Sequence, residues 1–94
     1  MEHEELLLVA VVEMADGHVE AGRRYEDAVL ALLGRHGGKL ERRLREDSGT
    51  EVHVIRFAGR AGLGTFMADP ERQALRSALG EAAPTTRVLE VRDI

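Results

Sequence analysis

The chain has 94 residues, with 17 acidic and 13 basic side chains and a net charge of −4. This balance argues against nucleic acid and against an anionic membrane surface as partners, because both attract basic proteins. Cysteine is absent, which excludes disulfides, thiolate nucleophiles and cysteine-ligated metal. We expect residues 1–94 to form one domain with one modest core.

The first predicted element is a strand over residues 6–12, where every side chain is apolar and valine is frequent. Such a run is typical of a central strand, and it is far shorter than the ~20 residues that a membrane-spanning helix needs. The residues before it are acidic, unlike the basic start of a signal peptide. We therefore expect a cytoplasmic protein.

A helix is predicted from residue 19 or 20 to residue 36, after a turn at Asp16-Gly17. Gly37 and Gly38 are expected to end it by supplying left-handed backbone. The helix prediction rests on side chains at i, i+3 and i+4 spacing: Tyr25, Ala28, Val29, Leu32, Leu33 and His36.

Two strands are predicted next, joined by a hairpin turn at residues 46–49. The first, residues 40–45, is highly charged, which suits an edge strand. The second covers residues 52–57 and is largely apolar. Alternation along it places Val52, Val54 and Arg56 on one face and the other three side chains on the opposite face: His53, Ile55 and Phe57.

The last two predicted elements are a helix that begins at Asp69-Pro70 and a strand over residues 86–91. Asp69 is the expected N-cap and Pro70 the first helical residue, and Pro84 ends the helix. Upstream, the glycines of residues 59–64 match no phosphate-loop spacing. We expect a flexible segment there, with an apolar wall formed by Leu63, Phe66 and Met67.

The order βαββαβ with right-handed crossovers predicts a ferredoxin-like α+β fold, with a four-stranded antiparallel sheet and helices on one face. The second and fourth strands should be the edges. The other sheet face would be uncovered, and residues 6–12 place apolar side chains on it. We therefore predict a homodimer in which two such faces pack around a twofold axis.

The chain resembles the dimeric α/β-barrel superfamily and, within it, the small proteins of domain of unknown function family 1330. Where that family commonly has tryptophan, an acidic residue and tyrosine, this chain has Phe66, Arg56 and Arg72. The matching motifs are Tyr25-Glu26, His36-Gly37-Gly38-Lys39-Leu40, Val54-Ile55-Arg56-Phe57 and Asp69-Pro70-Glu71-Arg72-Gln73-Ala74-Leu75.

This resemblance implies two sheets that face each other across a dimer. The superfamily includes cofactor-free monooxygenases, muconolactone isomerases, haem-degrading enzymes and proteins without known activity. The fold therefore does not select one function.

Two residues are candidates for catalysis. His53 shares its face with Ile55 and Phe57, so it points to a covered side of the sheet and would act as general acid or base. A buried histidine whose hydrogen bonds are satisfied is the favoured alternative. Tyr25, the sole tyrosine, would donate a hydrogen bond to a substrate, whereas simple packing with a hydrated hydroxyl is the favoured alternative.

Three charged or titratable residues are candidates for ligand binding. His36 lies where the helix dipole favours an imidazolium, although helix capping already explains a histidine there. Arg42 shares parity with Leu40 and Leu44, and together with Arg56 it would bind a carboxylate in bidentate fashion. Ion pairs of these arginines with Glu13 or Glu90 are the favoured alternative.

We expect a pocket between helices and sheet that binds a small organic ligand, lined by Tyr25, His53, Phe57, Phe66 and Met67. No metal or cofactor is predicted, because the histidines lack metal-ligand spacing and the serines lack a nucleophile motif. Three functions stay open: a binding domain without turnover, a cofactor-independent isomerase or monooxygenase, and a regulatory protein-interaction domain. The sequence does not decide whether the protein is an enzyme.

Overall fold

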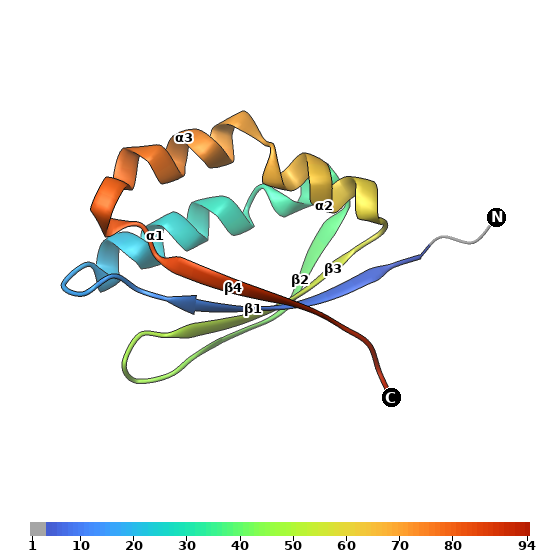
Figure 1. The fold of residues 1–94 in the computed structure, drawn as a ribbon, viewed down its shortest axis with the longest axis horizontal. Coiled ribbons are helices and arrows are strands. Elements are labelled where there is room, and N and C mark those ends of the chain that lie inside the picture. Colours follow the sequence, from blue (N-terminus) through green and yellow to red (C-terminus); the bar gives the residue numbers. More distant parts are fainter. Residues whose placement is uncertain (1–3) are drawn as a thin grey trace.

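The computed structural model describes residues 4–94, which form a four-stranded antiparallel sheet with its helices on one face (Figure 1). The strand order is β2-β3-β1-β4, so β2 and β4 are the edges, and the predicted ferredoxin-like fold is confirmed. The elements are β1 (Leu6–Glu13), α1 (Val19–Leu30), the 3₁₀ helix η1 (Leu33–His36), β2 (Gly38–Arg45), β3 (Glu51–Phe57), α2 (Arg60–Met67), α3 (Pro70–Leu79), the 3₁₀ helix η2 (Gly80–Ala82) and β4 (Thr85–Val91).

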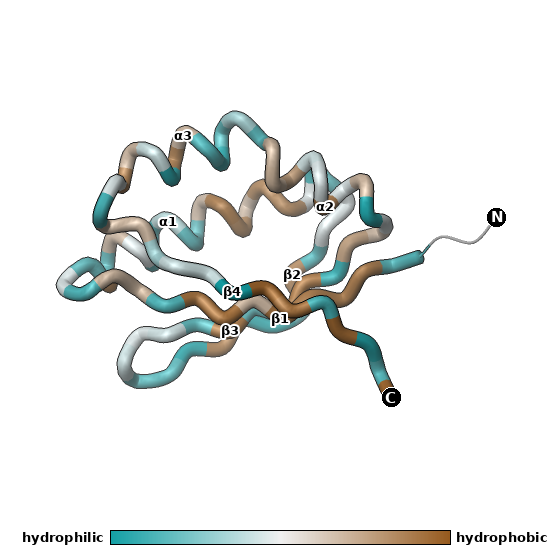
Figure 2. The backbone as a smooth tube through the Cα atoms, viewed as in Figure 1, coloured by the Kyte–Doolittle hydropathy of each residue, from teal (hydrophilic) through white to brown (hydrophobic). Residues whose placement is uncertain are grey.

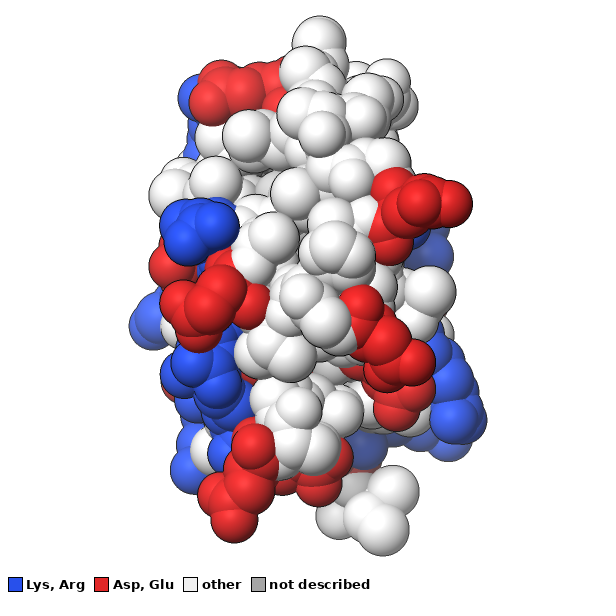
Figure 3. All heavy atoms as spheres, turned by 90° about the vertical axis from the view of Figure 1, so that its left-hand side faces the viewer, with Lys and Arg blue, Asp and Glu red and all other residues white. Residues whose placement is uncertain are grey.

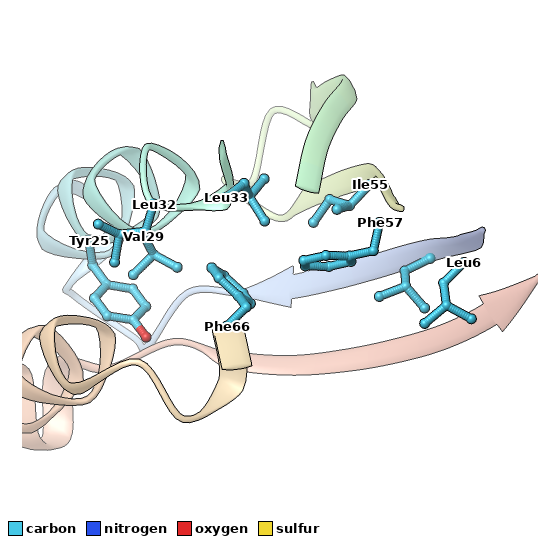
Figure 4. Close-up of a cluster of buried hydrophobic side chains, with 9 residues drawn as sticks. Leu6, Tyr25, Val29, Leu32, Leu33, Ile55, Phe57 and Phe66 are labelled. Carbon is cyan, nitrogen blue, oxygen red and sulfur yellow. The ribbon is translucent and has the colours of Figure 1, made fainter. Parts of the chain in front are cut away.

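The sheet has a helix-covered face and an open face, defined as the face without helices. In β1 the even-numbered residues Leu6 to Val12 are buried against the helices, while Leu7, Val9 and Val11 alternate onto the open face. Figure 2 shows hydrophobic residues along β1, along β3 and in the second part of α1. These elements contribute most of the core. The core cluster consists of Leu6, Leu8, Tyr25, Val29, Leu32, Leu33, Ile55, Phe57 and Phe66, most of which are labelled in Figure 4.

The first helix is shorter than predicted. α1 ends at Leu30, and a 3₁₀ turn carries the chain through η1 to His36. Gly37 is left-handed with φ 71°, as expected, but Gly38 already begins β2. Gly38 is needed for close packing instead: a Cβ there would lie 2.9 Å from the Phe57 ring.

The glycine-rich segment is a regular helix, α2, rather than the loose segment that the sequence predicted. Gly62 explains part of the glycine content. A Cβ at this position would collide with the backbone oxygen of His36 and touch the Phe57 ring, so α2 packs directly against η1 through a residue without a side chain.

A β-bulge in β2 corrects one sequence prediction. The register shifts between Leu40, which lies opposite Ile55, and Arg42, which lies opposite Val54. The extra residue places Arg42 on the open face, so Arg42 does not share the side of Leu40 as simple alternation predicted. Arg43, opposite His53, is the residue that turns toward the helices.

The last helix begins as predicted, because the Asp69 carboxylate accepts a 2.9 Å hydrogen bond from the backbone N–H of Glu71, with Pro70 as first helical residue. None of the residues in α3 is buried, and Leu75 and Leu79 are only half-buried. Figure 1 shows α3 farther from the sheet than α1.

The surface carries mixed charge. Viewed from the end of the molecule in Figure 3, acidic and basic side chains lie on both sides of an uncharged strip. Within residues 4–94, no helix is both long and apolar enough to cross a membrane.

Candidate functional site

A pocket of about 490 Å³ lies between the helices and the covered face of the sheet. Every layer of the fold contributes to its wall, and most of the lining is apolar. Such a concave, mainly apolar pocket with a few polar groups is typical of small-molecule sites. Its lining residues are Leu8, Ala10, Val12, Tyr25, Glu26, Val29, Leu30, His53, Ile55, Phe57, Leu63, Phe66, Met67, Arg72, Arg76, Thr86 and Val88.

Glu26 is the most unusual residue of this wall. It lies in α1 beside Tyr25, with only 5% of its surface exposed. Burial, reinforced by the negative charge of Glu51, raises the pKa of the Glu26 carboxyl from 4.5 to about 7, although Arg43, Arg72 and Arg76 act to lower it. A carboxyl group that titrates near pH 7 can both accept and return a proton under physiological conditions.

Glu51 has the opposite character, although it is fully buried at the start of β3. Burial acts to raise the pKa of Glu51, but hydrogen bonds from Arg43, His53 and Arg45 outweigh it and lower the pKa to about 2. The distances to the arginine nitrogens are 2.8 Å from Arg43 Nε and 2.7 Å from Arg45 Nη2. Glu51 is therefore an ionised carboxylate at neutral pH, hydrogen-bonded to the pocket-lining residue His53.

His53 lies between these two carboxyl groups. Its Nε2 is 2.7 Å from Glu51 Oε1, and its Nδ1 is 4.0 Å from Glu26 Oε1. An ionised carboxylate only accepts hydrogen bonds, so this geometry assigns the Nε2 hydrogen to the bond with Glu51. Nδ1 then faces Glu26 and the pocket. Nδ1 of His53 can accept a proton from a bound molecule, and the Glu51 carboxylate would balance the positive charge that forms on the ring.

Further polar groups of the wall come from α1 and α3. Tyr25 precedes Glu26 in α1, and Figure 4 shows the tyrosine ring projecting with its hydroxyl directed away from the helix. Arg72 and Arg76 extend from α3 into the lining. The Arg72 guanidinium carbon lies 5.3 Å above the Phe66 ring, in a cation–π contact. The pocket thus combines a titratable carboxyl, a phenol and two guanidinium groups.

Five of the residues selected from sequence line this one pocket: Tyr25, His53, Phe57, Phe66 and Met67. Phe57 and Phe66 pack with ring centroids 5.8 Å apart, and Figure 4 shows their rings pointing toward one another. The structure thus places the two catalytic candidates, His53 and Tyr25, in the same wall. Their roles stay predictions.

The other three selected residues lie elsewhere. His36 binds Asp69 Oδ2 through Nε2 at 2.7 Å and Thr65 Oγ1 through Nδ1 at 2.8 Å, and it thereby connects η1 to the N-terminus of α3. The hydrogen bond from His36 also lowers the pKa of the Asp69 carboxyl. Arg42 lies on the open face, as the β-bulge requires.

Arg56 forms ion pairs, as the favoured alternative predicted, but with different partners. Its guanidinium lies 2.8 Å from Glu41 and 3.5 Å from Glu5, not beside Glu13 or Glu90. Glu90 pairs with Arg60 at 2.7 Å instead.

Sequence reasoning missed four polar residues of the site. Glu26 had a detectable signal, because it lies three residues before Val29 and four after Gly22, on the inner face of α1. Arg72 and Arg76 are four residues apart on α3, so they share one helix face. Glu51 gave no comparable signal, since an acidic residue beside a hairpin is usually solvated.

Among residues 4–94, no group of three or more His, Asp or Glu side chains is placed to hold a metal ion. The polar side chains that line the pocket can supply proton transfer, hydrogen bonding and charge stabilisation.

No protein-family model matches the chain. A search of curated proteins likewise gives no match. Solved structures do match, and the likeness covers nearly the whole of each chain.

A "Putative antibiotic biosynthesis monooxygenase" from Nitrosomonas europaea is 10% identical, with a TM-score of 0.78, over 100% of this chain and 94% of that one. A second protein with the same description, from Bacteroides thetaiotaomicron, is 9% identical with a TM-score of 0.80, over 97% and 90% of the two chains. SnoaB, a cofactor-independent oxygenase from Streptomyces nogalater, is 16% identical with a TM-score of 0.74, over 97% and 96%. At these identities the similarity shows the fold, which is the ferredoxin-like fold of these oxygenase-type structures.

Proposed function

We propose that the protein is a cofactor-independent enzyme that binds a small, mostly apolar organic compound and removes a proton from it. The observation that carries this proposal is the Glu26 carboxyl, buried in the wall of a 490 Å³ pocket with a pKa raised to about 7. A strongly perturbed carboxyl group in a cleft is characteristic of catalytic acids and bases. One of the similar structures is that of a cofactor-independent oxygenase, which supports the same class of chemistry.

Each polar group has a role in this mechanism. The ionised Glu26 carboxylate accepts a proton from a C–H or O–H bond of the substrate, and the bond's electron pair stays on the substrate as an enolate-type anion. Tyr25 donates a hydrogen bond to that anion. His53 is held in place by Glu51 through Nε2. Its other ring nitrogen, Nδ1, is a second proton acceptor in the pocket wall.

This first step is common to two reaction classes. In an isomerase, the protonated Glu26 returns the proton to a different atom of the same substrate. In a monooxygenase, the anion formed from a CH₂ group reacts with dioxygen, which is the second reactant. One oxygen atom becomes the new carbonyl oxygen and the other leaves as water, and the substrate itself supplies all the electrons. The pocket chemistry supports proton abstraction in either class.

A second candidate function is ligand binding without turnover. It is favoured by the short Glu51 contact, which already satisfies one ring nitrogen of His53. In this case the same pocket holds a ligand, while the Glu51 network only stabilises the sheet.

We also propose that the protein forms a homodimer through the open face. Val9 pairs with Val54 on one side and with Leu89 on the other, so these residues form an apolar row across that face. A regulatory partner protein on this face is the alternative. Membership of domain of unknown function family 1330 and a cytoplasmic location remain predictions.

Solvent hydrogen exchange tests the enzyme proposal with a generic ketone in place of the natural substrate. The probe is 2-tetralone, an apolar ketone with acidic C–H bonds, followed by NMR in deuterated water. We expect the protein to accelerate exchange with a pH profile that rises near pH 7, following ionisation of Glu26. Glu26→Gln should abolish the acceleration, whereas the matched variant Glu20→Gln, exposed on the same helix, should retain it.

Exchange that persists in Glu26→Gln would contradict the role of Glu26 as base. Binding of the ketone without any accelerated exchange would favour the ligand-binding alternative.

A further inference from the structure

We infer that the pocket selects an organic anion, a compound with an apolar body and a carboxylate that is held by Arg72 and Arg76 of α3. This inference rests on the proposed function, because it names the substrate class of the same pocket. It assigns anion recognition to two residues that sequence reasoning placed in no such role.

The two arginines lie together in the pocket wall. They are four residues apart on α3, so their side chains extend from the same face of the helix on successive turns. Both line the pocket. The positive charges of both also act to lower the pKa of the Glu26 carboxyl, which lines the same pocket.

Neither arginine has an acidic partner among residues 4–94. Ion pairs in this part of the chain engage six other arginines: Arg23, Arg35, Arg43, Arg45, Arg56 and Arg60. Arg72 and Arg76 instead donate to backbone oxygens, at 3.4 Å to Met67 and at 3.1 Å to Pro84. In a chain with more acidic than basic side chains, two adjacent cations without a carboxylate partner are available for an external one.

Arg72 has a further unsatisfied group. Its Nε is buried and has no hydrogen-bond partner in the described structure. A buried donor without a partner is destabilising, because the hydrogen bonds it made to water are not replaced. A carboxylate bound between the two guanidinium groups would supply acceptors for both, in the bidentate geometry that arginine favours.

The apolar lining of the pocket fits the apolar body of such a ligand. Ile55, Phe57, Leu63 and Phe66 provide an apolar wall, and the Phe66 ring lies directly under the Arg72 guanidinium. An aromatic or aliphatic body would contact these side chains while its carboxylate reaches α3. The arginines also offset the repulsion that a second anion would meet near Glu26.

A matched pair of probes tests this inference by isothermal titration calorimetry. 2-Naphthoate and 2-naphthamide share one apolar body and differ in charge. For the native protein we expect naphthoate to bind more tightly than naphthamide by about tenfold or more, equal to about 1.4 kcal/mol.

The double variant Arg72→Gln/Arg76→Gln should bind the two probes about equally, with naphthamide affinity unchanged. The control Arg24→Gln/Arg92→Gln removes the same charge from exposed positions outside the pocket, and it should keep the preference. Circular dichroism melting establishes that each variant is folded. If the double variant does not fold, Arg72→Lys provides the test, because it keeps the charge but loses the bidentate geometry and should weaken naphthoate binding alone.

Equal affinity of the native protein for both probes, or a preference that survives in the double variant, would overturn the inference and leave the proposed function intact. Absence of binding by either probe would count against the pocket as a ligand site, and therefore against the proposed function and this inference together.

Discussion

The Nδ1 atom of His53 lies 4.0 Å from Oε1 of Glu26, while the opposite ring nitrogen is bound to Glu51. One imidazole therefore separates a carboxyl whose pKa is about 7 from a carboxyl whose pKa is about 2. Two carboxyl groups with strongly different pKa values mark different roles, the first as proton acceptor and the second as fixed negative charge.

Glu26 should make the protein less stable as the pH rises. Its folded pKa of about 7 exceeds the unfolded value of 4.5, so the folded state holds the proton more tightly between these pH values. The free energy of unfolding should fall by about 3 kcal/mol from pH 4.5 to pH 8 on account of this group.

Urea unfolding at several pH values measures this effect. Glu26→Gln should remove that part of the decline, while Glu20→Gln should leave it intact. Identical slopes in the native protein and Glu26→Gln would show that Glu26 is not perturbed.

Glu51 should show the opposite dependence on pH. Its folded pKa of about 2 lies below the unfolded value of 4.5, so its contribution is complete above pH 4.5 and is lost as the pH falls toward 2. Glu51→Gln should cost about 3–5 kcal/mol at pH 7, because Arg43, Arg45 and His53 lose their shared anion.

Chemical denaturation at pH 7 and at pH 3 checks this prediction for Glu51→Gln. Glu46→Gln, at an exposed position near the same hairpin, is the control and should be nearly neutral. A similar small cost for both variants would mean that the buried network contributes little.

The two central glycines of α2 should respond in opposite ways to alanine. Gly62→Ala forces a Cβ into the backbone oxygen of His36, and the cost should be about 1–3 kcal/mol. Gly64→Ala meets nothing within 4 Å and removes a helix-interior glycine, so it should stabilise the protein by up to about 1 kcal/mol.

Thermal melting of the two variants side by side provides the measurement. Equal changes in melting temperature would contradict the close packing of α2 on η1.

Much of the fold was predictable because apolar runs and helix capping are local signals. The continuous apolar run of residues 6–12 indicated a strand and the Asp69-Pro70 start indicated a helix, each from a few neighbouring residues. The β-bulge beside Arg42 was not predictable, since an inserted residue leaves no mark in a strand that is charged throughout.

The candidate site was predictable only in part, for a related reason. His53 was placed on the correct face by its apolar neighbours, whereas Glu26 was passed over because a charged residue in a helix is usually exposed. Arg72 and Arg76 line the pocket because α3 stands away from the sheet, and that separation depends on tertiary packing.

The apolar row on the open face should hold two copies together. Size-exclusion chromatography with light scattering should give twice the chain mass of 10.3 kDa for the native protein. Val54→Glu places a charge in the centre of that row and should give a monomer, because an unpaired buried charge is costly. Ala74→Glu adds the same charge at an exposed position on α3 and should stay dimeric. A native monomer would refute the proposed interface.

The poised Glu26 carboxyl can be observed directly by an NMR titration of the glutamate side-chain carboxyl carbons, labelled with carbon-13, in the native protein and in Glu26→Gln. We expect one carboxyl resonance to titrate near pH 7 and to be missing from the variant. Titration of every glutamate below about pH 5, close to the ordinary value for this side chain, would contradict the claim that Glu26 is poised to accept a proton in the pocket.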